Sequence, residues 1–283
     1  MINFNGDLIS SGTAYLDTQN RGFRYGDLLQ ENVRYTGSEI LFWEQHYFRI
    51  MASVRQLRME IPMAFTMEFL EDQIRYTLKA SNLDAGFANI IIWLYRTSAR
   101  EYDRSKNGVG FIIEVRPIQS SAYPHLKADM RVDLFKDYFI HADPLSSLSF
   151  ANGPVRNLAN IFAKENGLDG MILLNHNKEV CEMLGGTLFA KMGDTWITPA
   201  DSSGCETTVI RQELIKQWPQ LDIEDLKVRP VSPFELQKAD ELFSISETYG
   251  FCSVTHYRKT LFKTDSTQVL AHRFNQTFFG VKS

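Results

Sequence analysis

Amphipathic helical patterns alternate with short apolar runs along this 283-residue chain, and no other feature constrains its fold as strongly. Apolar residues recur at helical spacing from Trp43 until Ile61-Pro62 ends the pattern, which predicts an amphipathic helix. Residues 69–78 repeat the arrangement, and the apolar runs at 90–95 and 110–115 predict short buried strands. We therefore predict an α+β structure for the first part of the chain.

A change of pattern follows at Arg116-Pro117. The stretch beginning there contains Ser120, Ser121 and Pro124 and has neither the helical nor the strand period, which predicts an interdomain linker. Further strands are predicted at residues 130–140, 171–174, 180–189 and 195–198, and further helices at residues 155–163 and 209–218. Because 283 residues exceed the usual size of one hydrophobic core, we predict two α/β domains, residues 1–120 and 121–283.

Composition excludes several classes of partner. Hydrophobic residues make up 44% and charged residues 23% of the chain, an ordinary globular mixture. Thirty basic against thirty-four acidic residues give a net charge of -4, which argues against a nucleic-acid-binding surface. The longest apolar run, residues 90–95, is too short to cross a bilayer, and the N-terminus lacks the pattern of a secretory signal. A cytoplasmic protein without membrane contact is the expectation.

The cysteines and histidines do not predict a disulfide framework or a metal site. Cys181, Cys205 and Cys252 are widely separated and odd in number, which favours reduced thiols. CxxC and HxxH pairs are absent from the sequence, so we expect no metal.

Chemistry is suggested by motifs that begin with the segment Asn20-Arg21-Gly22-Phe23-Arg24-Tyr25-Gly26-Asp27, followed by Glu31. The others, in order, are His46-x-x-Arg49, Val180-x-Glu182 with Phe189, Thr198-Pro199, Gly204-Cys205, Val209-Ile210-Arg211 and Ala239-Asp240-Glu241-Leu242-Phe243. With these motifs the chain resembles the class-IV aminotransferases and aminodeoxychorismate lyases, the pyridoxal-phosphate enzymes of fold type IV. The resemblance implies a two-domain D-amino acid aminotransferase-like fold, a cofactor cleft between the domains, and a homodimer.

Two family positions are kept. By resemblance, Arg49 binds the cofactor phosphate, for which the guanidinium fork of donors is suited. By resemblance, Glu182 pairs with the pyridine nitrogen of the cofactor. The alternatives are an ion-paired arginine on a helix surface and an exposed strand glutamate.

The Schiff-base lysine of the family is missing. The segment Leu145-Ser146-Ser147-Leu148-Ser149-Phe150-Ala151-Asn152 resembles the family's LSSLKTxN, which places Ser149 at the lysine position. A hydroxyl cannot form an imine. Lys136, Lys164 and Lys191 are the candidates for a relocated lysine, and each is predicted to be a solvated surface residue.

The phosphate-binding segments have changed as well. Where relatives carry a motif like GxLxGITR, this chain has Glu206 for the apolar leucine and Thr208 for the glycine. The amides of Val209 and Ile210 at a helix N-terminus could still bind an anion, and Glu206 could equally serve the helix dipole.

A second phosphate loop departs from the family in the same way. After Phe243, relatives carry small segments such as LTNA or MSGT, whereas this chain has Ile245 and Glu247. These residues put bulk and a carboxylate where a phosphate would bind. Leu28 and Gln30 also depart from the opening motif, so we predict a reshaped cleft.

Three hypotheses follow. We favour a catalytically degenerate homologue that binds pyridoxal phosphate weakly or not at all and instead binds a partner or an amino acid- or keto acid-like metabolite, with an active paralogue as one candidate partner. The second is an active branched-chain or D-amino acid aminotransferase, or an aminodeoxychorismate lyase, using another lysine. The third is a cofactor-independent enzyme with Glu182, Glu206 or Glu247 as acid or base.

Overall fold

The computed structural model describes residues 1–13, 20–97, 107–120, 122–126, 129–151 and 153–280. The chain divides into two compact units, the first made of Met1–Ser121 and Ser149–Asn152, the second of Ala122–Leu148 and Gly153–Ser283. Ser121 of the predicted linker and Asn152 of the lysine-position segment lie outside the described residues. The boundary at residue 120 and the cofactor cleft remain predictions.

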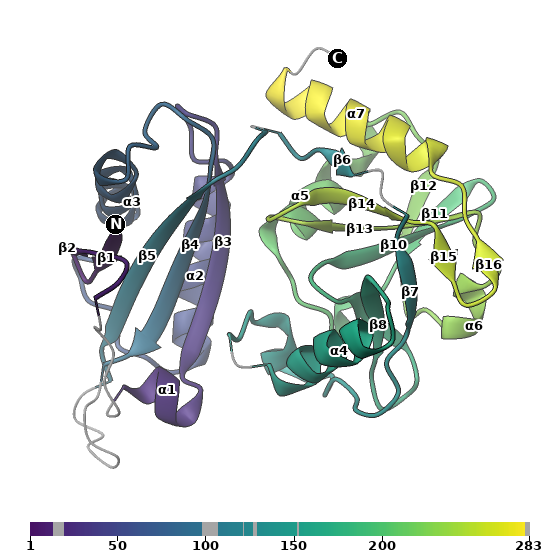
Figure 1. Ribbon diagram of the computed structural model, residues 1–283, viewed down its shortest axis with the longest axis horizontal. Coiled ribbons are helices and arrows are strands. Elements are labelled where there is room, and N and C mark those ends of the chain that lie inside the picture. The colour runs from purple at the N-terminus through teal and green to yellow at the C-terminus, as the bar shows by residue number, and fades with distance from the viewer. Residues whose placement is uncertain (14–19, 98–106, 121, 127–128, 152, 281–283) are drawn as a thin grey trace. The chain divides into compact units, whose positions relative to one another are not determined.

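The first unit is built on an antiparallel sheet of five strands in the order β2-β1-β5-β4-β3 (Figure 1). Its strands are β1 (Ile2–Phe4), β2 (Asp7–Ile9), β3 (Leu28–Tyr35), β4 (Ala88–Arg96) and β5 (Val109–Pro117). Its helices are α1 (Arg21–Tyr25), α2 (Trp43–Gln56) and α3 (Met67–Ala80). Helix α2 packs against β3, and α3 packs against β5 and β1. The apolar runs predicted at 90–95 and 110–115 are confirmed as β4 and β5, two interior strands of this sheet.

Both predicted helices are present, although one is shorter than its pattern. Helix α3 begins where the Thr66 side chain accepts a hydrogen bond from the Phe69 amide, at 3.1 Å. The pattern that begins at Trp43 predicted a helix as far as Ile61, but α2 ends at Gln56. Arg58 adopts a left-handed conformation with φ of 56°, and this turns the chain out of the helix while Met59 remains buried. Apolar periodicity therefore continued beyond the end of the helix.

The second unit contains two sheets. One has six strands in the order β12-β11-β10-β13-β14-β6, and the other has five in the order β16-β15-β7-β8-β9. The strands are β6 (His125–Leu126), β7 (Arg131–Leu134), β8 (Gly170–Leu174), β9 (Val180–Met183), β10 (Thr187–Met192), β11 (Thr195–Thr198), β12 (Asp225–Val228), β13 (Glu241–Ser246), β14 (Gly250–Val254), β15 (His256–Tyr257) and β16 (Thr260–Leu261). The helices are α4 (Pro154–Glu165), α5 (Val209–Gln217), α6 (Pro233–Leu236) and α7 (Asp265–Phe279), with short 3-10 helices η1 (Pro144–Ser147), η2 (Asp201–Ser203) and η3 (Trp218–Gln220).

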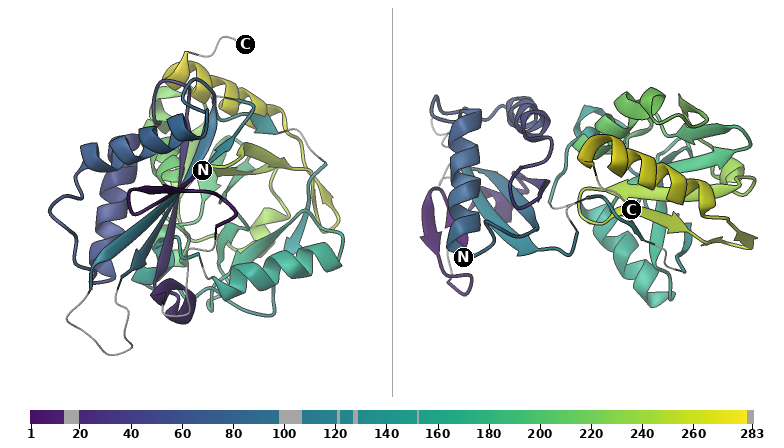
Figure 2. Two further views of the ribbon diagram at one scale, coloured as in Figure 1. Left: turned by 60° about the vertical axis from the view of Figure 1, so that its left-hand side comes forward. Right: turned by 90° about the horizontal axis from the view of Figure 1, so that it is seen from above.

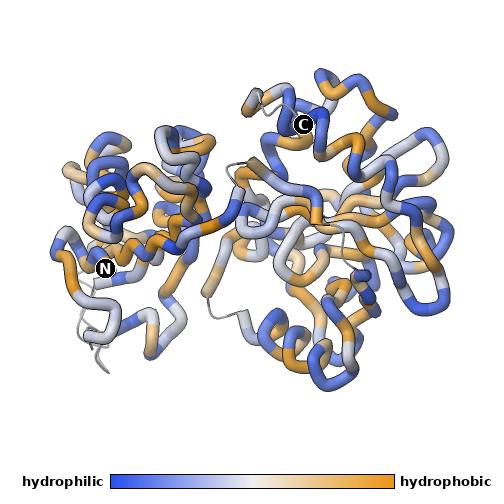
Figure 3. The backbone as a smooth tube through the Cα atoms, turned by 45° about the horizontal axis from the view of Figure 1, so that its top comes forward, coloured by the Kyte–Doolittle hydropathy of each residue, from blue (hydrophilic) through white to orange (hydrophobic). Residues whose placement is uncertain are grey.

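One apolar core joins the two sheets of this unit, because buried side chains of β7 and β8 pack in the same cluster as those of β10 and β13. Helix α4 covers a neighbouring cluster with Ala159 and Ala163, and it ends before Gly167, as predicted. The helices alternate hydrophilic and hydrophobic segments, as α7 does beside the C mark in Figure 3. This alternation is the pattern expected of helices with one buried face.

The strand predicted at 130–140 is wrong in its second half, because β7 ends at Leu134. Phe135 and Ile140 are buried against α4, so the apolar residues after β7 reach the core from an irregular segment. The Ile140 amide donates to the Leu174 carbonyl at 2.8 Å, which restores contact with β8.

Helix α7 packs against β13, β14 and β6 (Figure 2). Its first turn is anchored by Glu241 of β13, whose carboxylate accepts from the amides of Ser266 and Thr267, each at 2.8 Å. Within the described residues, no helix is long and apolar enough to cross a membrane. All three cysteines are buried free thiols, which confirms the prediction from their number and spacing.

Candidate functional site

The opening motif forms a capped turn of helix in the first unit. The Asn20 side chain accepts from the Phe23 amide at 3.1 Å, and Gly26 ends α1 with φ of 73°. Arg21 and Asp27 form an ion pair at 2.7 Å. The motif therefore has a structural role, which is to direct the chain into β3.

Strand β3 places Glu31 against two residues of α2. The Glu31 carboxylate is hydrogen bonded to His46 Nδ1 at 2.6 Å and accepts a second hydrogen bond from Arg49 Nη1. The Glu31 and His46 side chains are buried, and that of Arg49 is 10% exposed. Burial alone would raise the pKa of the Glu31 carboxyl, but the charge of Arg49 and the bond from His46 outweigh it and hold this pKa below its usual range.

Ser149, at the family's lysine position, lies beside this cluster. Its carbonyl accepts from the Gln30 amide at 2.9 Å, and Ala151 donates to the Leu28 carbonyl at 3.1 Å, so the segment pairs with β3. Arg49 Nη2 donates to Ser149 Oγ at 2.8 Å. The structure thus brings together Arg49 and Ser149, two of the residues predicted to belong to one site, and gives the arginine a carboxylate and a hydroxyl as partners within the chain.

In the second unit, Glu182 of β9 is held by a residue that sequence reasoning missed. Arg156 of α4 donates through Nε and Nη2 to the two carboxylate oxygens of Glu182, at 2.6 and 3.1 Å. The same guanidinium pairs with Glu206 at 3.4 Å, and the Glu206 amide donates to Glu182 at 3.2 Å. Glu182 is 5% exposed, so it is not the exposed strand glutamate of the alternative interpretation.

The guanidinium of Arg156 contacts both of these acids. Burial would lower the pKa of its guanidinium, but the carboxylates of Glu182 and Glu206 outweigh burial and raise it. This cluster of Arg156, Glu182 and Glu206 is therefore a partly buried network in which a forked cation is bound by two carboxylates. No signal in the sequence identified Arg156, because α4 and β9 meet only in the tertiary structure.

Helix α5 begins at Val209, so the amides of Val209 and Ile210 lie at a helix N-terminus, as predicted. Thr208 is the N-cap, and its side chain accepts from the Arg211 amide at 3.4 Å. The Ile210 amide donates to Glu247 Oε1 at 2.6 Å, while Tyr123 donates its hydroxyl to Glu247 Oε2 at 2.7 Å. Glu247 is 6% exposed. A carboxylate of the chain is thus bound at the helix N-terminus, where backbone amides attract anions.

Ile245 is 1% exposed, and it pairs with Thr187 and Phe251 within the six-stranded sheet. Among the described residues, no group of three or more His, Cys, Asp or Glu side chains is arranged to hold a metal ion.

The candidate replacement lysines differ from one another. Lys136 and Lys164 are exposed, as predicted, but the prediction that Lys191 is a solvated surface lysine is wrong. The Lys191 side chain is 15% exposed and donates to Glu224 at 2.5 Å and to Ser266 at 2.9 Å. Its ammonium is held by these two partners because β10 directs it toward the segment before β12 and the first turn of α7.

Comparison with known proteins identifies relatives over most of the chain. A family model described as amino-transferase class IV matches residues 29–257. An 82-residue segment is 27% identical to a D-alanine aminotransferase of Staphylococcus haemolyticus, and this match spans 29% of the present chain and only 28% of that enzyme.

Solved structures resemble the fold over nearly its full length. A branched-chain aminotransferase of Thermoproteus uzoniensis, crystallised with norvaline, aligns with a TM-score of 0.85 at 19% identity, covering 97% of this chain and 93% of that one. A branched-chain amino acid aminotransferase of Thermobaculum terrenum in its PLP form gives 0.84 at 20% identity, covering 99% and 94%. A putative 4-amino-4-deoxychorismate lyase of Legionella pneumophila gives 0.79 at 21% identity, covering 94% and 96%. The predicted α/β fold of type IV is therefore confirmed.

Proposed function

The chain belongs to the amino-transferase class IV family, and we propose that it is a member without transaminase activity, which keeps the fold in order to bind a metabolite or a partner protein. Covalent attachment of pyridoxal phosphate requires a lysine amine, and Ser149 at the lysine position has only a hydroxyl. When bound, the cofactor supplies an electron sink for substrate carbanions. On this proposal, the chain does not bind the cofactor and therefore lacks this electron sink.

The bond from the Ile210 amide to the Glu247 carboxylate carries the proposal. By resemblance, the amides at the start of α5 are those that hold the cofactor phosphate. Here the Ile210 amide donates to Glu247 at 2.6 Å, and Tyr123 holds the second carboxylate oxygen at 2.7 Å. A phosphate brought to this amide would meet a buried group of the same charge, which is strongly unfavourable. The residues present therefore do not fit the phosphate end of the cofactor.

Two further contacts support the same conclusion. Arg156 occupies both oxygens of Glu182, the carboxylate that the resemblance assigns to the pyridine nitrogen. Arg49, assigned to the phosphate, is bound to Glu31 and Ser149 within the first unit. In each case a side chain of the protein takes a partner that the cofactor would need.

A purely structural role for these contacts agrees with the proposal. Glu241 anchors the first turn of α7 in the same way as Glu247 anchors that of α5, and a carboxylate at a helix N-terminus stabilises the fold. Even in this structural role, Glu247 accepts the hydrogen bond of the Ile210 amide, so this amide is not available to a ligand. On this proposal, the missing lysine and the internal contacts have the same origin. The chain binds the cofactor less well, and its fold is stable without the cofactor.

The remaining hypotheses have less support. An active enzyme with a relocated lysine would need an amine that is available for imine formation, but Lys191 is held by Glu224. A cofactor-independent acid–base role would need a carboxylate that is available to a substrate, but Glu182 and Glu206 are both bound by Arg156.

The test is to measure cofactor binding and half-transamination by the unmodified protein. Equilibrium dialysis with pyridoxal phosphate and absorbance spectra should give no saturable binding, and L- and D-amino acids should give no cofactor-dependent keto acid. An active class-IV aminotransferase assayed in parallel controls for the reagents. Saturable binding with amino acid-dependent spectral change would overturn the proposal.

The proposal extends to partners. By resemblance the protein forms a homodimer, or a mixed dimer with an active paralogue, and binds an amino acid- or keto acid-like ligand. Light scattering on the purified protein should give twice the chain mass of 32.5 kDa, whereas a monomer at all concentrations would contradict the homodimer.

A further inference from the structure

A hollow of about 460 Å³ lies in the second unit, lined by the ends of β7 and β8, helix α6 and the turn between β15 and β16. Its volume falls within the usual range for small-molecule sites, roughly 300–1,000 Å³. Leu134 and Leu174 contribute buried aliphatic surface. Phe139 is half-buried, and Phe234 at the start of α6 is 72% exposed. A large aromatic ring left in solvent beside such a hollow is apolar surface that a ligand could cover.

Three cations line this apolar hollow, namely Lys136, Lys178 and Arg258, and none of the lining residues is acidic. Arg258 has an ion-pair partner, because its Nε lies 3.3 Å from Asp133. Within the described part of the chain, neither Lys136 nor Lys178 forms an ion pair. Lys178 Nζ instead lies 3.6 Å from the centre of the Phe139 ring, a cation–π contact. The hollow thus carries uncompensated positive charge in a chain whose net charge is -4.

Two of these cations are held at defined turns. Lys178 has φ of 62°, and its amide donates to the Asn175 carbonyl at 3.0 Å, while the Asn175 side chain accepts from the Glu179 amide at 3.0 Å. Arg258 has φ of 57° in the turn between β15 and β16. Left-handed backbone is uncommon for residues with a side chain such as these. The turns therefore fix where both cationic side chains leave the backbone.

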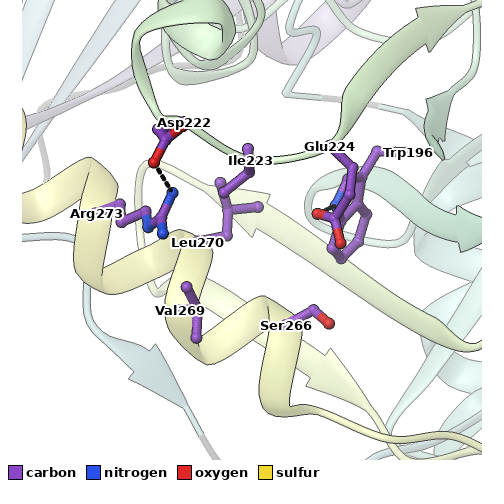
Figure 4. A pocket seen from close by; sticks show the side chains of 8 residues that line it. All are labelled: Trp196, Asp222, Ile223, Glu224, Ser266, Val269, Leu270 and Arg273. Carbon is purple, nitrogen blue, oxygen red and sulfur yellow. Dashed lines mark hydrogen bonds and ion pairs between the residues drawn. The ribbon is translucent and has the colours of Figure 1, made fainter. Parts of the chain in front are cut away.

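A second hollow of about 530 Å³ shows the contrast (Figure 4). It lies beside α7, and its charges are satisfied within the protein. Arg273 pairs with Asp222 at 3.3 Å, as the dashed line in Figure 4 marks, and Glu224 pairs with Lys191 at 2.5 Å. That hollow has no charge left for a ligand, whereas the hollow at Lys178 does.

We propose that the hollow at Lys178 binds an apolar carboxylic acid, with the hydrocarbon against Phe139, Phe234 and the two leucines and the carboxylate between Lys136 and Lys178. The apolar lining favours a hydrocarbon body, and the unpaired ammonium groups favour an anion over a neutral or cationic head group. The site belongs to the second unit alone. It is independent of the cofactor-binding residues, so its test does not depend on the proposed function.

The experiment compares octanoate with 1-octanol, its uncharged counterpart, by isothermal titration calorimetry on the full-length protein. Octanoate should bind at least tenfold more tightly than octanol, and the difference should shrink as salt is added. Lys178→Asn removes the charge and keeps a residue that tolerates left-handed backbone, and it should weaken octanoate binding about fivefold to tenfold. Lys136→Asn should have a similar effect. Lys164→Asn, which removes an exposed lysine from α4, is the matched control and should change binding less than twofold.

Three results would overturn this site. The first is the absence of saturable octanoate binding, and the second is equal affinity for octanoate and octanol. The third is an equal loss of octanoate affinity in Lys164→Asn and Lys178→Asn, which would indicate a general charge effect. Thermal unfolding of each variant, monitored by circular dichroism, distinguishes loss of the site from loss of the fold.

Discussion

The Ile210 amide donates a hydrogen bond of 2.6 Å to Glu247 Oε1, so the first turn of α5 is closed by a carboxylate that comes from the end of β13. In a helix N-terminus that serves as an anion site, this amide would face the ligand. On the proposed function, the same bond stabilises the fold and keeps a cofactor phosphate away from this amide.

Restoring the lysine alone should not restore the cofactor. Ser149→Lys should bind pyridoxal phosphate weakly, because Glu247 still occupies the Ile210 amide. Adding Glu247→Thr should improve affinity by about tenfold or more, since removal of a nearby like charge can contribute about 1.4 kcal/mol or more. Ser149→Lys with Glu165→Gln, which removes an exposed carboxylate from α4, is the charge-matched control. A tightly bound yellow protein from Ser149→Lys alone would refute the interpretation of Glu247.

Glu247 should stabilise the free protein. Glu247→Ala leaves the Ile210 amide and the Tyr123 hydroxyl without this acceptor, and each unsatisfied buried group costs about 1–3 kcal/mol. We expect urea unfolding to show a loss of at least about 2 kcal/mol, with a smaller loss for Tyr123→Phe. Glu165→Ala, on the exposed face of α4, should change stability by less than about 0.5 kcal/mol. Equal stability of Glu247→Ala and the unmodified protein would argue against a role as anchor.

Arg156 and Glu182 should be strongly coupled. Arg156→Met leaves two carboxylates facing each other without a cation, and breaking a buried pair in this way costs about 3–5 kcal/mol. Arg156→Lys should recover only part of the loss, because an ammonium lacks the fork that reaches both oxygens of Glu182. A double-mutant cycle with Glu182→Gln measures the coupling in the free energy of unfolding. Additive effects of the two changes would contradict the network.

The pair of Glu31 and Arg49 should contribute to stability at neutral pH and lose this contribution in acid. The folded protein holds the pKa of Glu31 below its usual range of about 4.3. Stability from this carboxylate is then fully present above that value and declines as pH falls through the lower, folded pKa. The stability difference between Glu31→Gln and the unmodified protein should therefore narrow as the pH of urea titrations is lowered from 7 to about 3. A difference that stays constant over this range would contradict the ionised pair.

The buried cysteines should be inert in the folded protein. Burial raises the pKa of Cys205 to about 11 and also raises that of Cys181, so little thiolate exists at pH 8. Iodoacetamide should label these two residues only after denaturation. Rapid labelling of either thiol under native conditions, read by mass spectrometry, would contradict this expectation.

The sequence predicted the fold further than it predicted the site. Apolar runs located β4 and β5, and helical spacing located α3 and α4, because these elements bury one continuous face or both faces. Periodicity was less informative where an irregular segment supplies core residues. For this reason a strand was predicted as far as Ile140, whereas β7 ends at Leu134.

Motifs selected Arg49, Glu182 and Glu247, but they could not select the partners of these residues. Arg156 reaches Glu182 from another element, and Tyr123 lies 124 residues from Glu247 in the chain. Pairings of this kind depend on tertiary packing, for which the sequence carries no local signal. The internal partners of Glu182 and Glu247 were therefore visible only in the structure.

Reductive trapping tests the central claim most directly. The unmodified protein is incubated with pyridoxal phosphate, reduced with borohydride, digested and mapped by mass spectrometry for a phosphopyridoxyl group on lysine. We predict only scattered, substoichiometric labelling of exposed lysines such as Lys164. Stoichiometric labelling of one lysine would contradict the account, because it would identify a working Schiff-base residue in place of Ser149.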